Sequence, residues 1–368
     1  MNKNPSLYSL RFYLCCVVIF LHWHFWDQAF FMRHSVLKTI FLPLTDGGFA
    51  LDIFFVLSGY FITYDLMISK LAPDSSFTFK KKVAVFYIKR VLRIFPIYYL
   101  LIAILFVVNW TNLRENILYY ITYNANFLVF RDAKWNNLSH TWSLAIEEQF
   151  YLIWPFIILL VPRNKLLITL ITLSFVSIGC YVYAISANYW LSILLPSCFF
   201  TFSAGGILAI LKIFHSKYLE FKWINLLLFL LLLLKFICFS RIFNGTFFNI
   251  MNDYERVIDV VLALLLINFF LLNPNILNFS ITSYLGKVSY GLYLYHYVIT
   301  TKFVSLFSEN FLLNFIIKFL LLIAISSISF ELIEKKLIQY GVYLIKNRVI
   351  NIVLKRNIEI TEQSRLHN

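Results

Sequence analysis

The run RFYLCCVVIFLH, residues 11–22, is apolar except for an arginine at its start and a histidine at its end. The rest of the chain has the same character, because 61% of its 368 residues are hydrophobic and only 14% are charged. Soluble domains carry about 25% charged residues. The composition therefore predicts an integral membrane protein, in which Arg11 and His22 occupy positions that lipid does not favour.

Long apolar runs divide the chain into membrane crossings. A bilayer core roughly 30 Å thick needs about 20 apolar residues per helical span. Runs such as INLLLFLLLLLKFICF (residues 224–239) and VVLALLLINFFLL (residues 260–272) are candidates for separate crossings. The pattern predicts an all-α, polytopic helical bundle with about ten transmembrane helices, near residues 7–25, 47–68, 94–109, 142–161, 165–185, 190–211, 222–240, 256–272, 284–305 and 312–333.

The basic residues predict the orientation of this bundle. With a cytoplasmic N-terminus, most Lys and Arg residues outside the spans fall on the cytoplasmic side, including those of the basic loop at 70–93 and those after residue 333. The positive-inside rule then favours both termini in the cytoplasm. Because membrane orientation accounts for the formal net charge of +14, we expect membrane lipid and no nucleic acid as a partner.

The domain organisation follows from the same pattern. We expect one transmembrane domain over residues 1–336 and a basic cytoplasmic tail over residues 337–368. Such a tail is too short for an attached soluble enzyme, so any chemistry is expected within the bundle. The first apolar run lacks a small-residue cleavage site and is expected to be a retained helix. The polar, aromatic-rich stretch 110–140 is expected to form an external cap or an interfacial helix.

Arg11 and His22 are expected on one face of the first span. Their separation of eleven residues is about three turns of α-helix and about 16 Å along the axis. Arg11 would then lie near the cytoplasmic surface, and His22 deep in the bilayer or toward its far side. Ionisable groups at that depth usually face a wet cavity. The alternative is that Arg11 extends to the interface and His22 is an interfacial histidine.

The next two segments add further candidates. Asp52, near the start of the second span, is a candidate helix-end or cavity carboxylate, while Ser58 and Gly59 allow close helix contact and can serve packing alone. After the basic loop, Arg90 and Arg93 share one helical face. Guanidinium groups suit phosphates through forked hydrogen bonds, so this pair is a candidate anion clamp. Ordinary positive-inside anchoring is the alternative.

Two consecutive glutamates open the fourth span. Glu147 and Glu148 point about 100° apart on a helix and cannot both face the same neighbour. Because carboxylates are costly at the entry of an apolar helix, we expect at least one to pair with a buried cation such as Arg90, Arg93 or His22. The other can lie at the interface.

Histidine and cysteine complete the set of reactive residue types. His296 lies in a tyrosine-rich helix, where it is either a hydrogen-bonded core residue or a catalytic one. The five cysteines lie within apolar segments without metal-ligand spacing. We therefore expect no metal site.

Taken together, these segments resemble acyltransferase family 3, whose bacterial members O-acetylate surface polysaccharides and related glycans. The resemblance covers the chain from residue 6 to about residue 336, with the motifs in the order of the family. It rests on Arg11 and His22 with ten residues between them, DIFFVLSGY (52–60), KRVLRIFP (89–96), TWSLAIEEQFYLIWP (141–155) and YLGKVSYGLYLYH (284–296).

The resemblance implies an acyl donor and an essential pair of residues. In the family, the arginine and histidine of the first span are regarded as essential, which here means Arg11 and His22. The expected donor is cytosolic acetyl-CoA or another acyl-CoA. We expect the CoA phosphates to be held by Arg90 and Arg93, together with Arg11, on the cytoplasmic side.

The resemblance also implies transfer to a hydroxyl group. A sugar hydroxyl needs a base to take its proton as it attacks the thioester, and His22 suits this role because histidine titrates at about pH 6.5. Glu147 or Glu148 could orient the imidazole or an arginine. A transient acyl-histidine is the alternative chemistry.

The acceptor and the cellular setting follow from the family. The acceptor is expected to be a lipopolysaccharide O-antigen, another surface glycan or a lipid-linked glycan, and the protein is expected to be a multi-pass protein of the bacterial inner membrane. A transporter or flippase for a lipid-linked glycan is the main alternative, because a multi-span bundle with internal charges fits that function too. A purely structural subunit would leave Arg11, His22 and the two glutamates unexplained.

Overall fold

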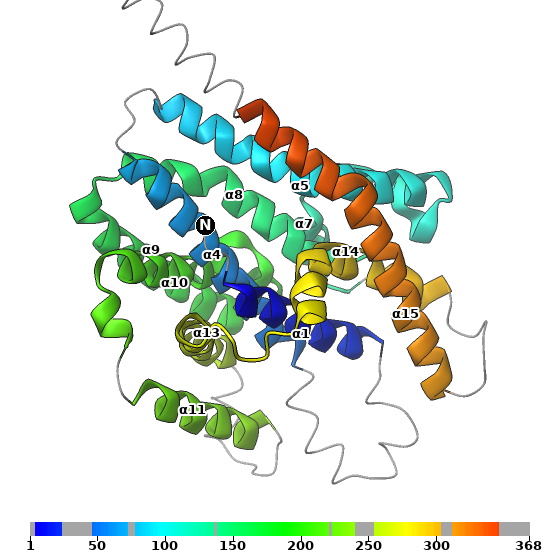
Figure 1. Ribbon diagram of the computed structural model, residues 1–368. Helices are drawn as coiled ribbons and strands as arrows, with labels where there is room; N and C mark the ends of the chain where they lie inside the picture. The colour runs from blue at the N-terminus through cyan, green and yellow to red at the C-terminus, as the bar shows by residue number, and fades with distance from the viewer. Residues whose placement is uncertain are drawn as a thin grey trace, which may run out of the picture.

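The computed structural model describes residues 4–23, 46–72, 78–135, 138–220, 223–239, 254–302 and 311–345. All regular secondary structure in these ranges is helical (Figure 1). In chain order the elements are α1 (Pro5–His22), α4 (Gly47–Leu71), α5 (Phe79–Val107), η3 (Trp110–Asn116), α6 (Ile117–Ile121), α7 (Ala125–Asp132), α8 (Thr141–Leu160), α9 (Arg163–Ala187), η4 (Tyr189–Ile193), α10 (Leu195–Phe214), η5 (Ser216–Leu219), α11 (Ile224–Phe239), α13 (Glu255–Leu272), α14 (Ser280–Lys302), α15 (Phe311–Ser329) and η6 (Phe330–Glu334).

Each of the ten expected spans coincides with a helix. Among the described helices, seven are long and apolar enough to cross a membrane: α1, α4, α5, α8, α9, α10 and the helix that contains α15. Helix α11 has only 16 residues, α13 begins with the charged sequence ERVID, and α14 is rich in Ser, Thr and Tyr. The all-helical membrane architecture is therefore confirmed, whereas the count of ten and the orientation of the termini stay predictions.

Helix α5 is much longer than expected. It begins at Phe79 rather than near residue 94, so the basic residues expected in a loop form its first half. Apolar residues interleave with the lysines there, and Phe86 is buried against the bundle, which gives this segment a packing face. A helix of 29 residues is about 43 Å long. The expected basic loop before Arg90 was therefore wrong.

The polar stretch after α5 forms a compact cap of short helices. Elements η3, α6 and α7 fold back toward α8. The side chain of Gln149 on α8 forms hydrogen bonds with the residues that join α6 to α7 and with α7 itself. Its amide nitrogen donates to the carbonyl of Tyr123 at 3.1 Å and to Asn126 Oδ1 at 3.0 Å. The expected cap is present as helical turns, and its placement outside the membrane stays a prediction.

Glycine allows two helix pairs to pack backbone against backbone. A Cβ atom at Gly59 would collide with the carbonyl of Phe202, and one at Gly205 would collide with the carbonyl of Val56, so α4 and α10 touch along their axes. Gly286 brings α14 equally close to Tyr8 of α1. Such contacts between small residues are the usual means of close helix packing in lipid.

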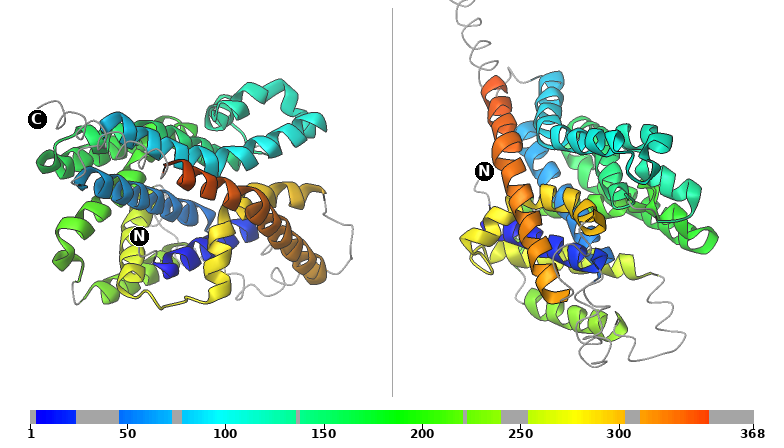
Figure 2. Two further views of the ribbon diagram at one scale, coloured as in Figure 1. Left: turned by 45° about the horizontal axis from the view of Figure 1, so that its top comes forward. Right: turned by 90° about the vertical axis from the view of Figure 1, so that its right-hand side faces the viewer.

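Beyond α15, the C-terminal helix lies beside α5 (Figures 1 and 2). It runs from α15 through a π-helical turn, η6, and stays helical to residue 345, within the segment expected as a tail. Residues 346–368 of that expected tail lie outside the described residues.

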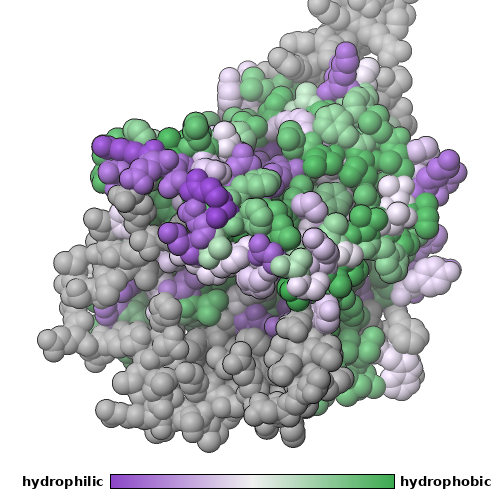
Figure 3. Space-filling model, turned by 180° about the vertical axis from the view of Figure 1, so that it is seen from behind, coloured by the Kyte–Doolittle hydropathy of each residue, from purple (hydrophilic) through white to green (hydrophobic). Residues whose placement is uncertain are grey.

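The surface fits a lipid environment. Large apolar side chains project from the helices, and at least half of the surface is exposed in each of Leu152, Phe175, Leu230 and Leu320. In the part of the rear face that Figure 3 colours, hydrophobic side chains cover much of the surface, and the largest group of hydrophilic side chains lies at the upper left. Burial of these apolar side chains in lipid removes them from water.

Substitution of Gly205 with alanine tests the packing of α4 against α10. Alanine is favoured over glycine in a helix by about 1 kcal/mol, but at Gly205 its methyl group meets the backbone of Val56. We expect Gly205→Ala to lower the free energy of unfolding by about 2 kcal/mol and to lower the melting temperature in detergent.

Gly179 on α9 is the matched control, because nothing lies within 4 Å of a Cβ atom there. Gly179→Ala is expected to leave the melting temperature unchanged or to raise it. Equal melting temperatures for the two variants would contradict the backbone contact.

Candidate active site

Helices α1, α8 and α14 carry the ionisable residues of the candidate site. On α1, Arg11 and His22 lie three turns apart, as expected. On α8, His140 at the N-cap and Glu147 are seven residues apart, which is about two turns and places them on one face. Because α1 packs on α14 and both glutamates line the same cavity as Arg11, these faces meet inside the bundle.

A cavity of about 880 Å³ lies between these helices and α4, α5 and the C-terminal helix. Its wall contains seven Lys or Arg residues and three Asp or Glu residues, so it favours an anionic ligand. The acidic residues are Asp65, Glu147 and Glu148. The basic residues are Arg11, Lys89, Arg90, Arg93, Lys212, Lys287 and Lys335.

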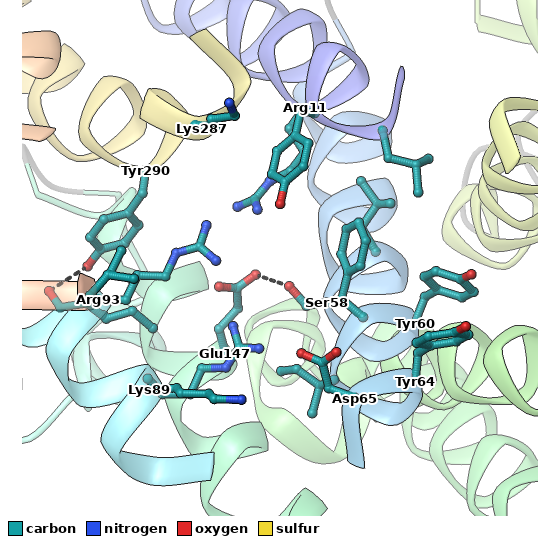
Figure 4. A pocket seen from close by; sticks show the side chains of 18 of the residues that line it. Arg11, Ser58, Tyr60, Tyr64, Asp65, Lys89, Arg93, Glu147, Lys287 and Tyr290 are labelled. Carbon is teal, nitrogen blue, oxygen red and sulfur yellow. Dashed lines mark hydrogen bonds between the residues drawn. The ribbon is translucent and has the colours of Figure 1, made fainter. Parts of the chain in front are cut away.

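Glu147 lies at the centre of the polar groups in this cavity. Ser58 Oγ donates to Glu147 Oε1 at 2.9 Å, and the Tyr151 hydroxyl donates to Glu147 Oε2 at 3.1 Å. Figure 4 shows the side chains of Arg11 and Arg93 projecting toward Glu147 from opposite walls. Two hydroxyls and nearby guanidinium groups thus stabilise a carboxylate within an otherwise apolar bundle.

The expected partner of the glutamates was a buried cation. The hydrogen bonds to Glu147 come from hydroxyl groups, and the guanidinium of Arg90 lies over the ring of Tyr151 at 5.6 Å. The positive charges of Arg11 and Arg90 also act on the Glu147 carboxylate. Glu147 and Glu148 line the same cavity but have different neighbours, because Glu147 contacts Ser58 and Tyr151 whereas Glu148 acts on Tyr98 and Tyr123.

His22 and His296 form a hydrogen-bonded pair at the other end of the same helices. His22 Nδ1 and His296 Nε2 are 2.9 Å apart, and the two rings are nearly parallel at 5.0 Å. His296 is fully buried, and its Nδ1 lies 2.6 Å from the carbonyl oxygen of Tyr293. The indole of Trp23 donates to the carbonyl of His296 at 3.1 Å. These contacts join α1 to α14. His22 is therefore part of a hydrogen-bonded cluster between two helices and is not an isolated interfacial histidine.

A hydroxyl pair separates the histidines from the cavity. Ser143 Oγ lies 2.6 Å from the hydroxyl of Tyr293, which donates to the carbonyl of His140 at 3.0 Å. Ser143 is one turn from Glu147 on α8, and Tyr293 is one turn from His296 on α14. The site therefore has two levels, a charged cavity and a histidine layer, joined by buried hydroxyls.

His140 is a third histidine in that layer and was not singled out from the sequence. It is buried, stacks on Tyr297 at 5.3 Å and lies 5.1 Å from the ring of His296. Its spacing of seven from Glu147 was the signal in the sequence that could have identified it.

Asp52 does not belong to this cavity. Its Oδ1 atom lies 2.7 Å from Nε of Arg256 on α13, and both side chains are buried. Arg256 Nη1 also donates to the carbonyl of Ser192 at 3.0 Å. Asp52 was expected as a candidate cavity carboxylate, and its observed contact instead ties α4 to α13 and η4. Arg256 was missed because the sequence gives no spacing that relates it to Asp52.

A second charged cluster holds α11 against the bundle. Lys235 Nζ lies 2.6–2.7 Å from carboxylate oxygens of Asp46, Glu255 and Asp259. The three carboxylates are close enough together to hold a metal ion, but the lysine ammonium lies within contact distance of all three. The cluster is therefore explained as a buried ion network.

The structure brings together most of the residues selected from the sequence. Arg11, Ser58, Arg90, Arg93, Glu147 and Glu148 all line one cavity. His22 and His296 pair with each other in the histidine layer. Only Asp52 lies apart from both groups, in contact with Arg256.

The fold and the site define a helical membrane protein with a cationic cavity and, separated from it by buried hydroxyls, a hydrogen-bonded histidine pair. A family model described as an acyltransferase domain matches residues 4–331 of the chain. The chain belongs to this family, acyltransferase family 3, and the resemblance noted from the motifs is confirmed.

Curated relatives support the same family. The peptidoglycan O-acetyltransferase OatA of Listeria monocytogenes is 34% identical over 145 residues, covering 34% of this chain and 22% of that protein. The O-acetyltransferase OatA of Staphylococcus aureus is 27% identical over 348 residues, covering 81% of this chain and 54% of that protein. An uncharacterized protein of Haemophilus influenzae is 30% identical over 225 residues, covering 54% of this chain and 89% of that protein.

The extent of these matches differs between relatives. The chain spans about half the length of the Staphylococcus aureus protein and less than a quarter of the Listeria monocytogenes protein. No solved structure matches the chain.

The pair of Asp52 and Arg256 leads to a stability prediction. Asp52→Leu leaves the buried guanidinium of Arg256 without its carboxylate, and loss of one partner of a buried ion pair costs about 3 kcal/mol or more. We expect a large fall in the melting temperature of the detergent-solubilised protein. The double variant Asp52→Leu with Arg256→Met removes both charges and is expected to recover much of the loss. A double variant less stable than Asp52→Leu alone would contradict this assignment.

Proposed function

We propose that this protein is a membrane-bound O-acyltransferase that moves an acyl group from cytosolic acyl-CoA to a hydroxyl of a bacterial glycan. Family membership supports an acyltransferase. The observation that carries the finer proposal is the cationic cavity that shares α1, α8 and α14 with the histidine layer. A phosphate-bearing donor suits the cavity, and a base suits the histidine layer.

The donor fits the charge of the cavity. Coenzyme A carries phosphate groups on its nucleotide end, and Arg and Lys bind phosphates through charge-assisted hydrogen bonds. Arg90 and Arg93 on α5 are proposed to hold these phosphates, with Arg11 closer to the thioester. The volume of about 880 Å³ lies within the range of about 300–1,000 Å³ common for small-molecule sites. Acetyl is the simplest acyl group, given the names of the relatives.

His22 is the proposed base. As the acceptor oxygen forms its bond to the thioester carbonyl carbon, its proton moves to His22, and the carbon–sulfur bond then breaks. The same proton is returned to the departing CoA thiolate, so the products are an ester and free CoA. Glu147, held by Ser58 and Tyr151, is proposed to orient Arg11 in the donor cavity. Glu148 is the second candidate for this role.

An acyl-histidine intermediate is the alternative path. The acyl group would first pass to a nitrogen of His22 and then to the acceptor. Trapping of labelled acyl groups on His22 in the absence of acceptor would favour this path over direct transfer.

The acceptor and location follow from the relatives. Two of them are named as O-acetyltransferases, one of them for peptidoglycan, and this supports a glycan of the cell envelope as the acceptor. A cell-wall glycan, a lipopolysaccharide O-antigen and a lipid-linked glycan are all compatible with the site. The proposed location is the bacterial cytoplasmic membrane, with both termini and the donor on the cytoplasmic side.

Transfer of label from radiolabelled acetyl-CoA to glycan in membrane vesicles tests this function. The wild type is expected to transfer label, and His22→Ala is expected to lower the rate by about 100-fold to 10,000-fold, the range for loss of a general base. Both proteins must be present at matched levels. Equal transfer by both would remove His22 from the chemistry, and movement of unmodified glycan across the membrane would favour a transporter.

The donor site is tested by Arg93→Gln. Loss of one charge-assisted hydrogen bond costs about 1.5–3 kcal/mol, so the KM for acetyl-CoA should rise by about 10-fold to 100-fold, with a smaller change in kcat. Arg163→Gln is the control, because the guanidinium of Arg163 lies over the ring of Phe214 at 3.9 Å and does not line the cavity. A KM that rises equally in both variants would contradict a phosphate-binding role for Arg93.

A further inference from the structure

We infer that His296 is a positioning residue that fixes the tautomer of His22, so that the Nε2 atom of His22 carries the lone pair that accepts a proton. The inference rests on the proposed function for its catalytic meaning, but not for the hydrogen-bond pattern itself. It assigns His296 a role through His22 and not a contact with the reacting atoms.

The pattern starts from a backbone carbonyl. His296 Nδ1 lies 2.6 Å from the carbonyl oxygen of Tyr293, one turn earlier on α14. A carbonyl oxygen only accepts hydrogen bonds, so Nδ1 of His296 must carry the hydrogen. In a neutral imidazole the other nitrogen then has none, and Nε2 of His296 is an acceptor.

The acceptor role of His296 Nε2 then determines the tautomer of His22. Nε2 of His296 is 2.9 Å from Nδ1 of His22. Because His296 accepts at this contact, His22 must donate, and the hydrogen of a neutral His22 is on Nδ1. Nε2 of His22 is therefore the nitrogen with the lone pair, and a base or a nucleophile acts through such a nitrogen.

The neutral form of His296 follows from its surroundings. The side chain is fully buried, and a charge in such a place costs far more free energy than a neutral ring. The groups of the described residues that face it include the imidazoles of His22 and His140, the rings of Tyr293 and Tyr297 and the Tyr293 carbonyl. A positive charge on His296 would also repel the charge that His22 gains in the reaction.

The same contact supports His22 after proton transfer. When Nε2 of His22 takes a proton, both of its ring nitrogens carry hydrogen, and Nδ1–H still donates to His296. The acceptor at His296 therefore suits both states of His22, and no side chain has to turn during the step. A base that is oriented by a third group in this way is the general arrangement for activation of a hydroxyl.

The tautomer is directly measurable. We would label histidine with ¹⁵N, place the protein in lipid nanodiscs at pH 8 and record solid-state spectra of the imidazole nitrogens. The signal that is lost in His22→Asn belongs to His22. The wild type is expected to show His22 with hydrogen on Nδ1, and an Nε2–H signal for His22 would overturn the inference.

Two substitutions of His296 separate positioning from packing. His296→Leu removes the acceptor, and we expect His22 to lose the fixed Nδ1–H form and kcat to fall by about 100-fold or more, with little change in the KM for acetyl-CoA. His296→Gln offers a side-chain carbonyl, and we expect it to retain the Nδ1–H signal and to restore most of kcat. An unchanged tautomer and full kcat in His296→Leu would overturn the inference.

A control variant and the two separate measurements, of the His22 tautomer and of acyl transfer, distinguish the possible outcomes. His215, at the end of α10, does not line the cavity or touch the histidine layer, and His215→Gln should change neither the His22 signal nor kcat. If the wild type shows the Nδ1–H signal but transfers no acyl group, the proposed function fails and the positioning of His22 stands. If it transfers acyl groups with His22 in the Nε2–H form, the positioning fails and the function stands.

Discussion

The cost of placing charge inside an apolar bundle governs this structure. Ionisable side chains on membrane helices need partners or water, and here they are gathered into a few sites rather than scattered. Glu147 is held by hydroxyls, Asp52 by Arg256, and Lys235 by three carboxylates. The helices pack in the arrangement that allows these contacts, and the cavity with its histidine layer is one result.

The clusters divide into two kinds. The pairs of α13, Arg256 with Asp52 and Asp259 with Lys235, satisfy charge with charge and hold helices together. The cavity instead has an excess of positive charge in its wall, which favours an anionic ligand. This difference separates clusters that stabilise the fold from the proposed active site, and it assigns Asp52 to the first kind.

Much of the fold could be predicted from the sequence, because lipid requires about 20 apolar residues per span and such runs are visible in any single chain. The start of α5 could not, because the lysines that precede Arg90 mask a helix whose apolar residues pack on one side. Likewise, spacing within one helix correctly placed Arg11 with His22 and Arg90 with Arg93. Contacts between helices, such as His22 with His296 or Asp52 with Arg256, depend on tertiary packing that no spacing records.

The π-helical turn of η6 has a consequence for how the two levels of the site relate. Before the turn, Phe315 and Phe319 pack on Trp23 beside the histidine layer; after it, Lys335 and Gln339 line the cavity. The wider turn changes which side of the helix faces the bundle. One continuous helix therefore contacts the histidine layer with one face and the cavity with another. A tilt of this helix would therefore displace the wall of the cavity and the aromatic side chains that pack on Trp23 together.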